Sequence, residues 1–144
     1  DLNAWVNLFK EFADSIGADV DMNQMYGTLY NKALEGDADC GGILSYGNYA
    51  GEPITNVEKG RPMVVRTPET KFNLANFMRS HLYTALGVIK VGMDILTKDE
   101  GVEIDTVLGH GGLFKTKGVG QKILADAINT PVVVMETAGE GGTW

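Results

Sequence analysis

Apolar residues recur every three or four positions over the first third of the chain and predict two helices. Residues 4–17 form the first helix, which Gly17 ends. Its apolar positions are Trp5, Leu8, Phe9, Phe12 and Ile16. Asp21 and Gln24, three residues apart, match a capping box and predict the start of a second helix, and Gly36 predicts its end. The apolar stripe of this second helix is Met22, Met25, Tyr26, Leu29, Tyr30 and Ala33.

The middle of the chain changes to short apolar runs and then returns to the helical period. A strand is predicted to begin at Ile43 and Leu44, residues 47–53 (GNYAGEP) are predicted as a loop, and residues 62–67 (PMVVRT) as a second strand. Thr67 is the predicted N-cap of a long helix that has Pro68 at its first position. The predicted buried face of that helix is Phe72, Ala75, Met78, Leu82, Leu86, Ile89, Met93 and Leu96.

The last third of the chain reads as strand, glycine loop, helix and strand. Residues 102–108 are predicted as a buried strand and residues 131–136 (PVVVME) as the last strand. The helix between them is marked by Val119, Ile123, Leu124, Ala127 and Ile128. The order of elements predicts one α/β domain over residues 1–144. Its final strand, helix and strand are expected to form a parallel, right-handed unit.

Composition and charge narrow the class of protein. The 144 residues are 44% hydrophobic and 22% charged, which is typical of a globular domain with a sizeable core. A net charge of −7 argues against nucleic-acid binding, and no apolar stretch is long enough to span a membrane. Cys40 is the only cysteine, so an internal disulfide framework is excluded and a reducing, cytoplasmic location is expected. The glycine-rich turn at residues 138–144 suggests a part of a longer chain.

The stretch TVLGHGGLFKTKGVGQKILAD, residues 106–126, places glycines between a strand and a helix. Such a turn lies at the carboxyl edge of a parallel sheet, where open α/β folds bind ligands, and a helix N-terminus suits phosphate. A tight turn without a ligand explains the glycines equally well. The spacing is neither GxGxxG nor a Walker A loop. Lys115 and Lys117 could face phosphate, although lysines in exposed loops are usually only solvated.

Residues suited to catalysis are scattered and form no recognisable set. His110 lacks an orienting carboxylate and a nucleophile nearby in the sequence, and a loop or core role fits it better. His81 lies beside the apolar stripe of the long helix, where a structural role is expected. Asp126 is expected to pair locally, and Ser45 has no GxSxG context. The chain therefore offers a candidate ligand loop and no catalytic residues.

The glycine loop and the following helix resemble the C-terminal signature of the FGGY family of carbohydrate kinases, usually GGGAKSPLWRQILADVLGRPV. Gly111 and Gly112 fall on its first two glycines. Like residues also fall at Lys115, Gln121, Ile123, Leu124, Ala125, Asp126 and Pro131. Residues 41–55 (GGILSYGNYAGEPIT) resemble the family's GLYFLPYLSGERTP loop, and Arg79 stands where the family often has RAVLEG. Residues 138–144 resemble the start of the family's final helix.

The resemblance implies the C-terminal lobe of an actin-like, RNase H-type ATPase, an α/β fold with a mixed sheet flanked by helices and lacking its final helix. It implies that Gly111, Gly112, Leu113 and Thr116 contact the adenine nucleotide. ATP and Mg²⁺ are the implied cofactors, bound mainly through an N-terminal lobe that this chain does not contain. Leu113 replaces the family's third glycine, and Tyr83 replaces a preferred glutamate.

The first functional hypothesis is therefore the nucleotide-binding lobe of an ATP-dependent sugar kinase, acting on a ketopentose of the xylulose or ribulose type. The sugar and the catalytic aspartate would be held by the absent lobe, so this chain alone is expected to be inactive. An actin-like nucleotide-binding or interaction module without transfer activity is the alternative. A Rossmann dinucleotide domain fits poorly, because the glycine loop comes late in the chain. The missing final helix would expose an apolar groove, which allows a homodimer.

Overall fold

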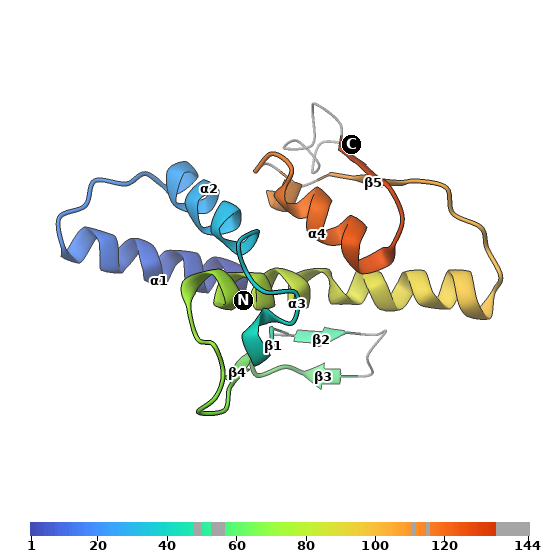
Figure 1. Ribbon diagram of the computed structural model, residues 1–144, viewed down its shortest axis with the longest axis horizontal. Helices are drawn as coiled ribbons and strands as arrows, with labels where there is room; N and C mark the ends of the chain where they lie inside the picture. Colours follow the sequence, from blue (N-terminus) through green and yellow to red (C-terminus); the bar gives the residue numbers. More distant parts are fainter. Residues whose placement is uncertain (48–49, 53–56, 111, 115, 135–144) are drawn as a thin grey trace. The chain divides into compact units, whose positions relative to one another are not determined.

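A computed structural model of the 144-residue chain describes residues 1–47, 50–52, 57–110, 112–114 and 116–134 (Figure 1). The chain divides into two compact units, residues 1–85 and residues 86–144. Among the described residues, no helix combines the length and the apolar character needed to cross a membrane.

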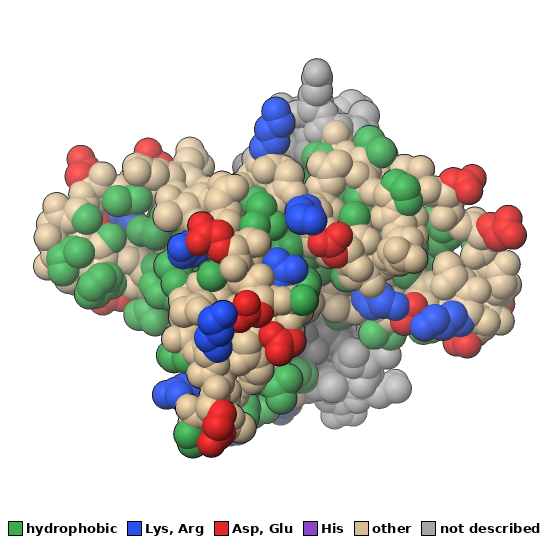
Figure 2. Space-filling model, in the orientation of Figure 1, with side chains coloured by type: hydrophobic (Ala, Val, Ile, Leu, Met, Phe, Trp, Pro, Cys, Tyr) green, Lys and Arg blue, Asp and Glu red, His purple; other side chains and the backbone are tan. Residues whose placement is uncertain are grey.

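The first unit begins with two helices, as the sequence predicted. α1 spans Leu2–Ser15, and Gly17 follows it with a φ of +75°. α2 spans Met22–Ala33, and the carboxylate of Asp21 accepts a hydrogen bond from the Gln24 N–H at 2.8 Å, which confirms the predicted cap. Hydrophobic side chains remain visible on the surface over these helices, at the left of Figure 2. The apolar stripe predicted for α1 is thus largely exposed. The buried residues of this helix are Val6 and Ala13, which the predicted stripe did not include.

Four short strands follow and pair as two antiparallel sheets of two strands each. After a 3₁₀ turn at Cys40–Gly42 (η1), β1 (Leu44–Tyr46) pairs with β4 (Met63–Val65), so both predicted strands are confirmed. β2 (Ala50–Glu52) pairs with β3 (Val57–Lys59). The prediction of a loop over residues 47–53 was therefore wrong for residues 50–52. Their low strand propensity concealed a hairpin that cross-strand hydrogen bonding creates.

The long helix α3 spans Leu74–Asp94 and starts later than predicted. Thr67 does not cap it. Thr67 and Thr70 instead close a turn, in which the Thr70 N–H donates to the Thr67 carbonyl at 3.1 Å. Proline is as favourable at the second position of such a turn as in a first helical turn, which explains the error. The side chain of Asn73 accepts from the Asn76 N–H at 2.8 Å and takes the cap position.

The prediction of a buried face on α3 is correct for only part of the helix. Ala75, Met78, Leu82 and Leu86 are buried. Phe72 precedes the helix and is exposed, as is Ile89. Leu96 lies in a π-helical segment, Ile95–Asp99 (η3), and is also exposed.

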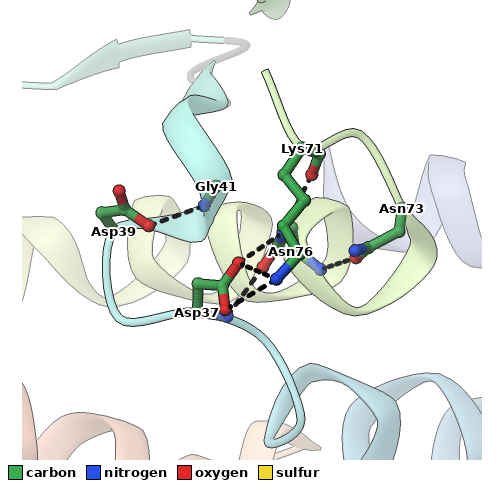
Figure 3. Close-up of polar contacts among 6 residues, drawn as sticks. All are labelled: Asp37, Asp39, Gly41, Lys71, Asn73 and Asn76. Carbon is green, nitrogen blue, oxygen red and sulfur yellow. Dashed lines mark hydrogen bonds and ion pairs between the residues drawn. The ribbon is translucent and has the colours of Figure 1, made fainter. Parts of the chain in front are cut away.

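A polar network joins the start of α3 to the turn around η1 (Figure 3). Asn76 is 1% exposed, and its Oδ1 accepts from the Asp37 N–H at 2.7 Å. Its Nδ2 donates to the Lys71 carbonyl at 2.9 Å and to Asp37 Oδ2 at 3.2 Å. The hydrogen bonds from Lys71 and Asn76 lower the pKa of the Asp37 carboxyl. The Lys71 N–H also donates to the Gly41 carbonyl at 3.0 Å, so backbone and side chains together hold the η1 turn.

The second unit contains a parallel pair of strands joined through a helix. β5 (Val107–Gly109) pairs in parallel with β6 (Val132–Val134), and α4 (Val119–Ile128) lies between them in sequence. The predicted parallel strand–helix–strand is thereby confirmed. The predicted strand over residues 102–108 was too long and too buried. Its register partner β6 spans three residues, and Leu108 is exposed.

Candidate functional site

The glycine loop connects β5 to α4 through a 3₁₀ turn, η4, at Gly112–Phe114. β5 ends at Gly109, whose register partner is Val134 of β6. The Val107 N–H donates to the Pro131 carbonyl at 2.9 Å and fixes this register. The loop therefore leaves the carboxyl end of a parallel strand, which is the position expected of a ligand-binding turn in an open α/β fold.

Two glycines of this region are needed for internal packing. An ideal Cβ atom at Gly109 would lie 2.8 Å from the ring of Phe114, and one at Gly120 would lie 2.9 Å from the Leu113 carbonyl oxygen. Real Cβ atoms do not approach other atoms so closely. A larger residue at either position would push η4 away from β5 or from α4. Gly109 and Gly120 thus place the loop, and they account for part of its glycine content without a ligand.

Gly112 differs from these two glycines. It is exposed, and an ideal Cβ atom there would meet no atom of the described residues within 4 Å. Nor does its backbone have a positive φ. Neither internal packing nor backbone conformation in the described part of the chain therefore requires glycine at position 112. A ligand that approaches the backbone closely would require it.

The other residues expected to contact nucleotide lie in the same loop. Leu113 and Thr116 are both half-buried. The Thr116 carbonyl accepts from the Val119 N–H at 3.3 Å, whereas its hydroxyl forms no hydrogen bond within the described part of the chain. Gly111 and Lys115 lie outside the described residues.

The N-terminus of α4 opens beside this loop. Gly118 is its N-cap in a left-handed conformation, with φ +80°, and no side chain caps the helix. The first N–H groups of α4 are therefore not used by a capping side chain, which leaves a positive dipole end next to η4. Lys117, immediately before the cap, is exposed.

Several residues of the signature stretch serve the structure instead. Gln121 Nε2 donates to the Val132 carbonyl at 2.7 Å and ties α4 to β6. Asp126 pairs with Lys122 at 3.3 Å, so the expectation of local pairing is confirmed. Ile123 and Leu124 are buried and form the apolar face of α4.

The remaining candidates for chemistry have structural surroundings. Ser45 Oγ donates to the Ser80 carbonyl at 2.8 Å and so ties β1 to α3. His81 is buried against Trp5 and Phe77, and desolvation, followed by the nearby N-terminal ammonium, lowers its pKa to about 4. His110 is exposed on the loop. Across the described ranges, no three His, Cys, Asp or Glu side chains are arranged to hold a metal ion.

Sequence reasoning did not single out Phe114, Gly118 or Gly120. Gly118 and Gly120, on either side of Val119, were the available signal. A glycine inside a predicted helix is unfavourable unless packing requires it, so its presence indicates a close contact. The contact of Gly120 with Leu113 is that requirement.

Comparison with known proteins places this geometry in a family. A search of curated protein sequences gave no match. Among solved structures, the chain is similar to the xylulose kinase from Rhodospirillum rubrum, with a TM-score of 0.63 and 14% sequence identity. The similarity covers 98% of this chain and 26% of that kinase, so the chain spans about a quarter of the kinase's length. The shared fold confirms the expected actin-like fold.

Residues 1–144 match the FGGY family of carbohydrate kinases, C-terminal domain, over their whole length. The matched residues include β5, the glycine loop and α4, and the loop and α4 are the segments that carry the resemblance to this family. The chain belongs to the FGGY family of carbohydrate kinases.

Proposed function

We propose that this chain is most of the nucleotide-binding lobe of an ATP-dependent sugar kinase, and that residues 1–144 act as one domain of it. The complete protein would transfer the γ-phosphoryl group of ATP to a hydroxyl of a ketopentose of the xylulose or ribulose type. Membership in the FGGY family supports the reaction class. The fold that the chain shares with a xylulose kinase motivates the choice of sugar, which the 14% identity leaves to experiment.

The observation that carries the nucleotide site is the open backbone at Gly112, where the described part of the chain does not itself require a glycine. In this proposal Gly111 and Gly112 lie against the nucleotide, and Leu113 and Thr116 approach the adenine. The free hydroxyl of Thr116 would hydrogen-bond a polar edge of the base. Gly109 and Gly120 support the site indirectly by holding η4 in place.

Phosphoryl transfer depends mainly on positioning and on stabilising the charge of the phosphates. Mg²⁺ would supply charge neutralisation when bound, chiefly through groups outside this chain. The residues of this lobe would bind the adenosine and orient the phosphates. The base for the sugar hydroxyl would be an aspartate of the other lobe. The isolated chain would then be inactive and would bind ATP weakly. We also propose that the protein is located in the cytoplasm.

A coupled assay of the full-length protein with a panel of ketoses tests the reaction. ATP turnover with a ketopentose supports the proposal. ATP binding without turnover on any sugar would favour the alternative, an actin-like module without transfer activity.

The nucleotide site is tested by Gly112→Val in the full-length protein. A side chain there would occupy the space proposed for ATP, so KM for ATP should rise by about tenfold or more, equivalent to about 1.4 kcal/mol or more. Gly27→Val is the matched control, because Gly27 of α2 also has no described atom within 4 Å of its ideal Cβ. Equal KM values for the two variants would contradict the placement of ATP at Gly112.

A further inference from the structure

The aromatic ring of Phe114 lies between the end of β5 and the start of α4. Its Cε1 and Cζ atoms are 2.8 Å from the ideal Cβ position of Gly109, which is the last residue of β5. Its Cδ1 atom is 3.3 Å from the ideal Cβ position of Gly120, which is in the first turn of α4. The half-buried ring therefore packs against a strand and a helix at the same time, at points where both backbones lack a side chain.

Packing holds η4 against its neighbours. Within the part of the chain that the structure describes, no backbone hydrogen bond joins Gly112, Leu113 or Phe114 to β5 or α4. The Leu113 side chain contributes on the helix side, where its Cγ is 3.3 Å from the ideal Cβ position of Gly120. The Phe114 ring extends this packing to the strand. Its removal would therefore release η4 from β5 and weaken the contact of η4 with α4.

The position of Gly112 depends on this packing. Gly112 and Phe114 are the first and last residues of the single 3₁₀ turn η4, so they move together. Gly112 has no side chain of its own, and no described atom lies within 4 Å of its ideal Cβ position. The backbone that the proposed nucleotide site presents to ATP is therefore held in place from Phe114.

We propose that Phe114 is a positioning residue for ATP. Its ring wedges η4 between β5 and α4 and so holds the Gly112 backbone where the nucleotide binds. This inference rests on the proposed nucleotide site, and it assigns Phe114 no contact with ATP. We call the contact of the ring with Gly109 and Gly120 the Phe114 wedge.

The Phe114 wedge should act on the binding of ATP and not on the transfer step. A loop that is already in place costs little to order on binding, whereas a loose loop weakens affinity by the free energy needed to order it. Once bound ATP has ordered the loop, the phosphates occupy the same position with or without the ring. Removal of the ring should therefore raise KM for ATP and preserve kcat at saturating ATP. A variant that is partly unfolded would show the opposite, a lower kcat with an unchanged KM.

Steady-state kinetics of the full-length protein test the Phe114 wedge. Phe114→Ala should raise KM for ATP by about tenfold, because the ligand then has to order η4. Its kcat should stay within about twofold of the wild-type value, and KM for the sugar should not change. Phe12→Ala is the matched control, since Phe12 is 64% exposed on α1, in the other unit. An unchanged KM for ATP in Phe114→Ala, or an equal rise in Phe12→Ala, would overturn the inference.

A pair of substitutions tests the contact with Gly109. Gly109→Ala adds a methyl group beside Cε1 and Cζ of the ring, so it should displace η4 and raise KM for ATP. Leucine has no atoms that correspond to Cε1 and Cζ, and Phe114→Leu therefore makes room for that methyl group. The double variant should have a lower KM for ATP than Gly109→Ala alone, with a coupling of at least about threefold. Additive effects of the two substitutions would overturn the Phe114 wedge.

Hydrogen exchange in the absence of ATP gives a readout that does not depend on the reaction. The amides of residues 107–122, from β5 to the first turn of α4, should exchange faster in Phe114→Ala than in the wild type. The reason is that the loop and this turn open more often without the ring. Equal exchange rates would overturn the Phe114 wedge, and circular dichroism verifies that each variant is folded.

The outcomes separate this inference from the kinase proposal. If the wild-type protein does not bind ATP, the kinase proposal and the positioning of ATP by Phe114 are overturned together. If the wild type uses ATP and Phe114→Ala has the same KM for ATP, only the role of Phe114 is overturned. Faster exchange together with a raised KM for ATP supports that role.

Discussion

Gly41 packs directly against the side-chain amide of Asn76. An ideal Cβ atom at position 41 would lie 2.4 Å from Asn76 Nδ2 and 2.8 Å from the Lys71 carbonyl oxygen. The backbone of Gly41 also has a φ of +61°. Since Asn76 is buried and uses its amide to hold Asp37 and Lys71, the absence of a side chain at Gly41 lets the η1 turn close on the start of α3.

Gly41→Ala should therefore lower the free energy of unfolding by about 2–5 kcal/mol. Of this, about 1–2 kcal/mol comes from the left-handed backbone, and about 1–3 kcal/mol from displacing a buried amide from its partners. Gly17→Ala is the matched control, because Gly17 has a φ of +75° and no described atom within 4 Å of its ideal Cβ. Urea unfolding of both variants should show a loss of only about 1–2 kcal/mol for Gly17→Ala. Equal losses would show that the contact with Asn76 contributes nothing.

Gly120→Ala and Gly27→Ala should change stability in opposite directions. Both glycines lie inside helices, where alanine is favoured by about 1 kcal/mol. Gly27 has open space around its ideal Cβ, so the substitution in α2 should stabilise the chain by about 0.5–1 kcal/mol. At Gly120 the new methyl group would meet the backbone oxygen of Leu113, and overpacking of about 1–3 kcal/mol outweighs the propensity. Thermal unfolding compares the two; stabilisation by Gly120→Ala would contradict the close packing of η4 on α4.

The elements that were predicted well from the sequence are those whose caps and apolar stripes lie within a few residues of one another in the chain. α2 has Asp21 as its cap and an apolar stripe, and α4 has its own buried face. The start of α3 was misplaced because Pro68 fits a turn and a first helical turn equally well. β2 and β3 were missed because hydrogen bonds between strands, absent from any local pattern, create them.

The sequence likewise predicted some features of the candidate site and not others. Its position after a parallel strand followed from the order of elements, and the glycine positions came from the family resemblance. The separate roles of the glycines could not be predicted, because they depend on contacts between segments. Only the fold shows that an ideal Cβ atom at Gly109 would meet Phe114 and that one at Gly120 would meet Leu113. An ideal Cβ atom at Gly112 would meet no described atom within 4 Å.

The free energy of unfolding should fall as the pH drops from about 6.5 toward 4, because of His81. Burial lowers its pKa to about 4 in the folded chain, although Asp1 Oδ2 lies 3.6 Å from Nδ1, and the unfolded chain has the ordinary value of 6.5. The unfolded state therefore binds the proton more tightly in this interval, and stability is fully present only above pH 6.5. The loss by pH 4 should be roughly 2–4 kcal/mol, at about 1.4 kcal/mol per pKa unit.

His81→Phe should remove this part of the pH dependence. Phenylalanine keeps a ring beside Trp5 and Phe77, and His81 Nε2 has no hydrogen-bond partner within the described residues that the substitution would break. Urea unfolding at several pH values compares the two proteins. If the variant shows the same slope between pH 4 and 6.5, the dependence arises from other groups.

Arg79 is a buried cation that relies on Tyr83. Its Nη2 donates to the Tyr83 hydroxyl at 3.0 Å, its Nη1 donates to the Ala33 carbonyl at 3.3 Å, and its guanidinium carbon lies 5.2 Å from the Tyr83 ring centre. Nε has no partner, and no ion pair involves Arg79 within the described ranges. Tyr83 thus takes the place that a carboxylate would otherwise hold beside a buried arginine.

Tyr83→Phe should lower the free energy of unfolding by about 1.5–3 kcal/mol, since it removes a hydrogen bond to a buried charge while keeping the ring. Tyr26→Phe is the matched control, because it also removes one hydroxyl bond, to Asn3, at an exposed site. That loss should be about 0.5–1 kcal/mol. In an Arg79→Met background, Tyr83→Phe should cost little, and the coupling energy from this double-mutant cycle should be about 0.5–3 kcal/mol. Additive losses would show that Arg79 does not depend on the Tyr83 hydroxyl.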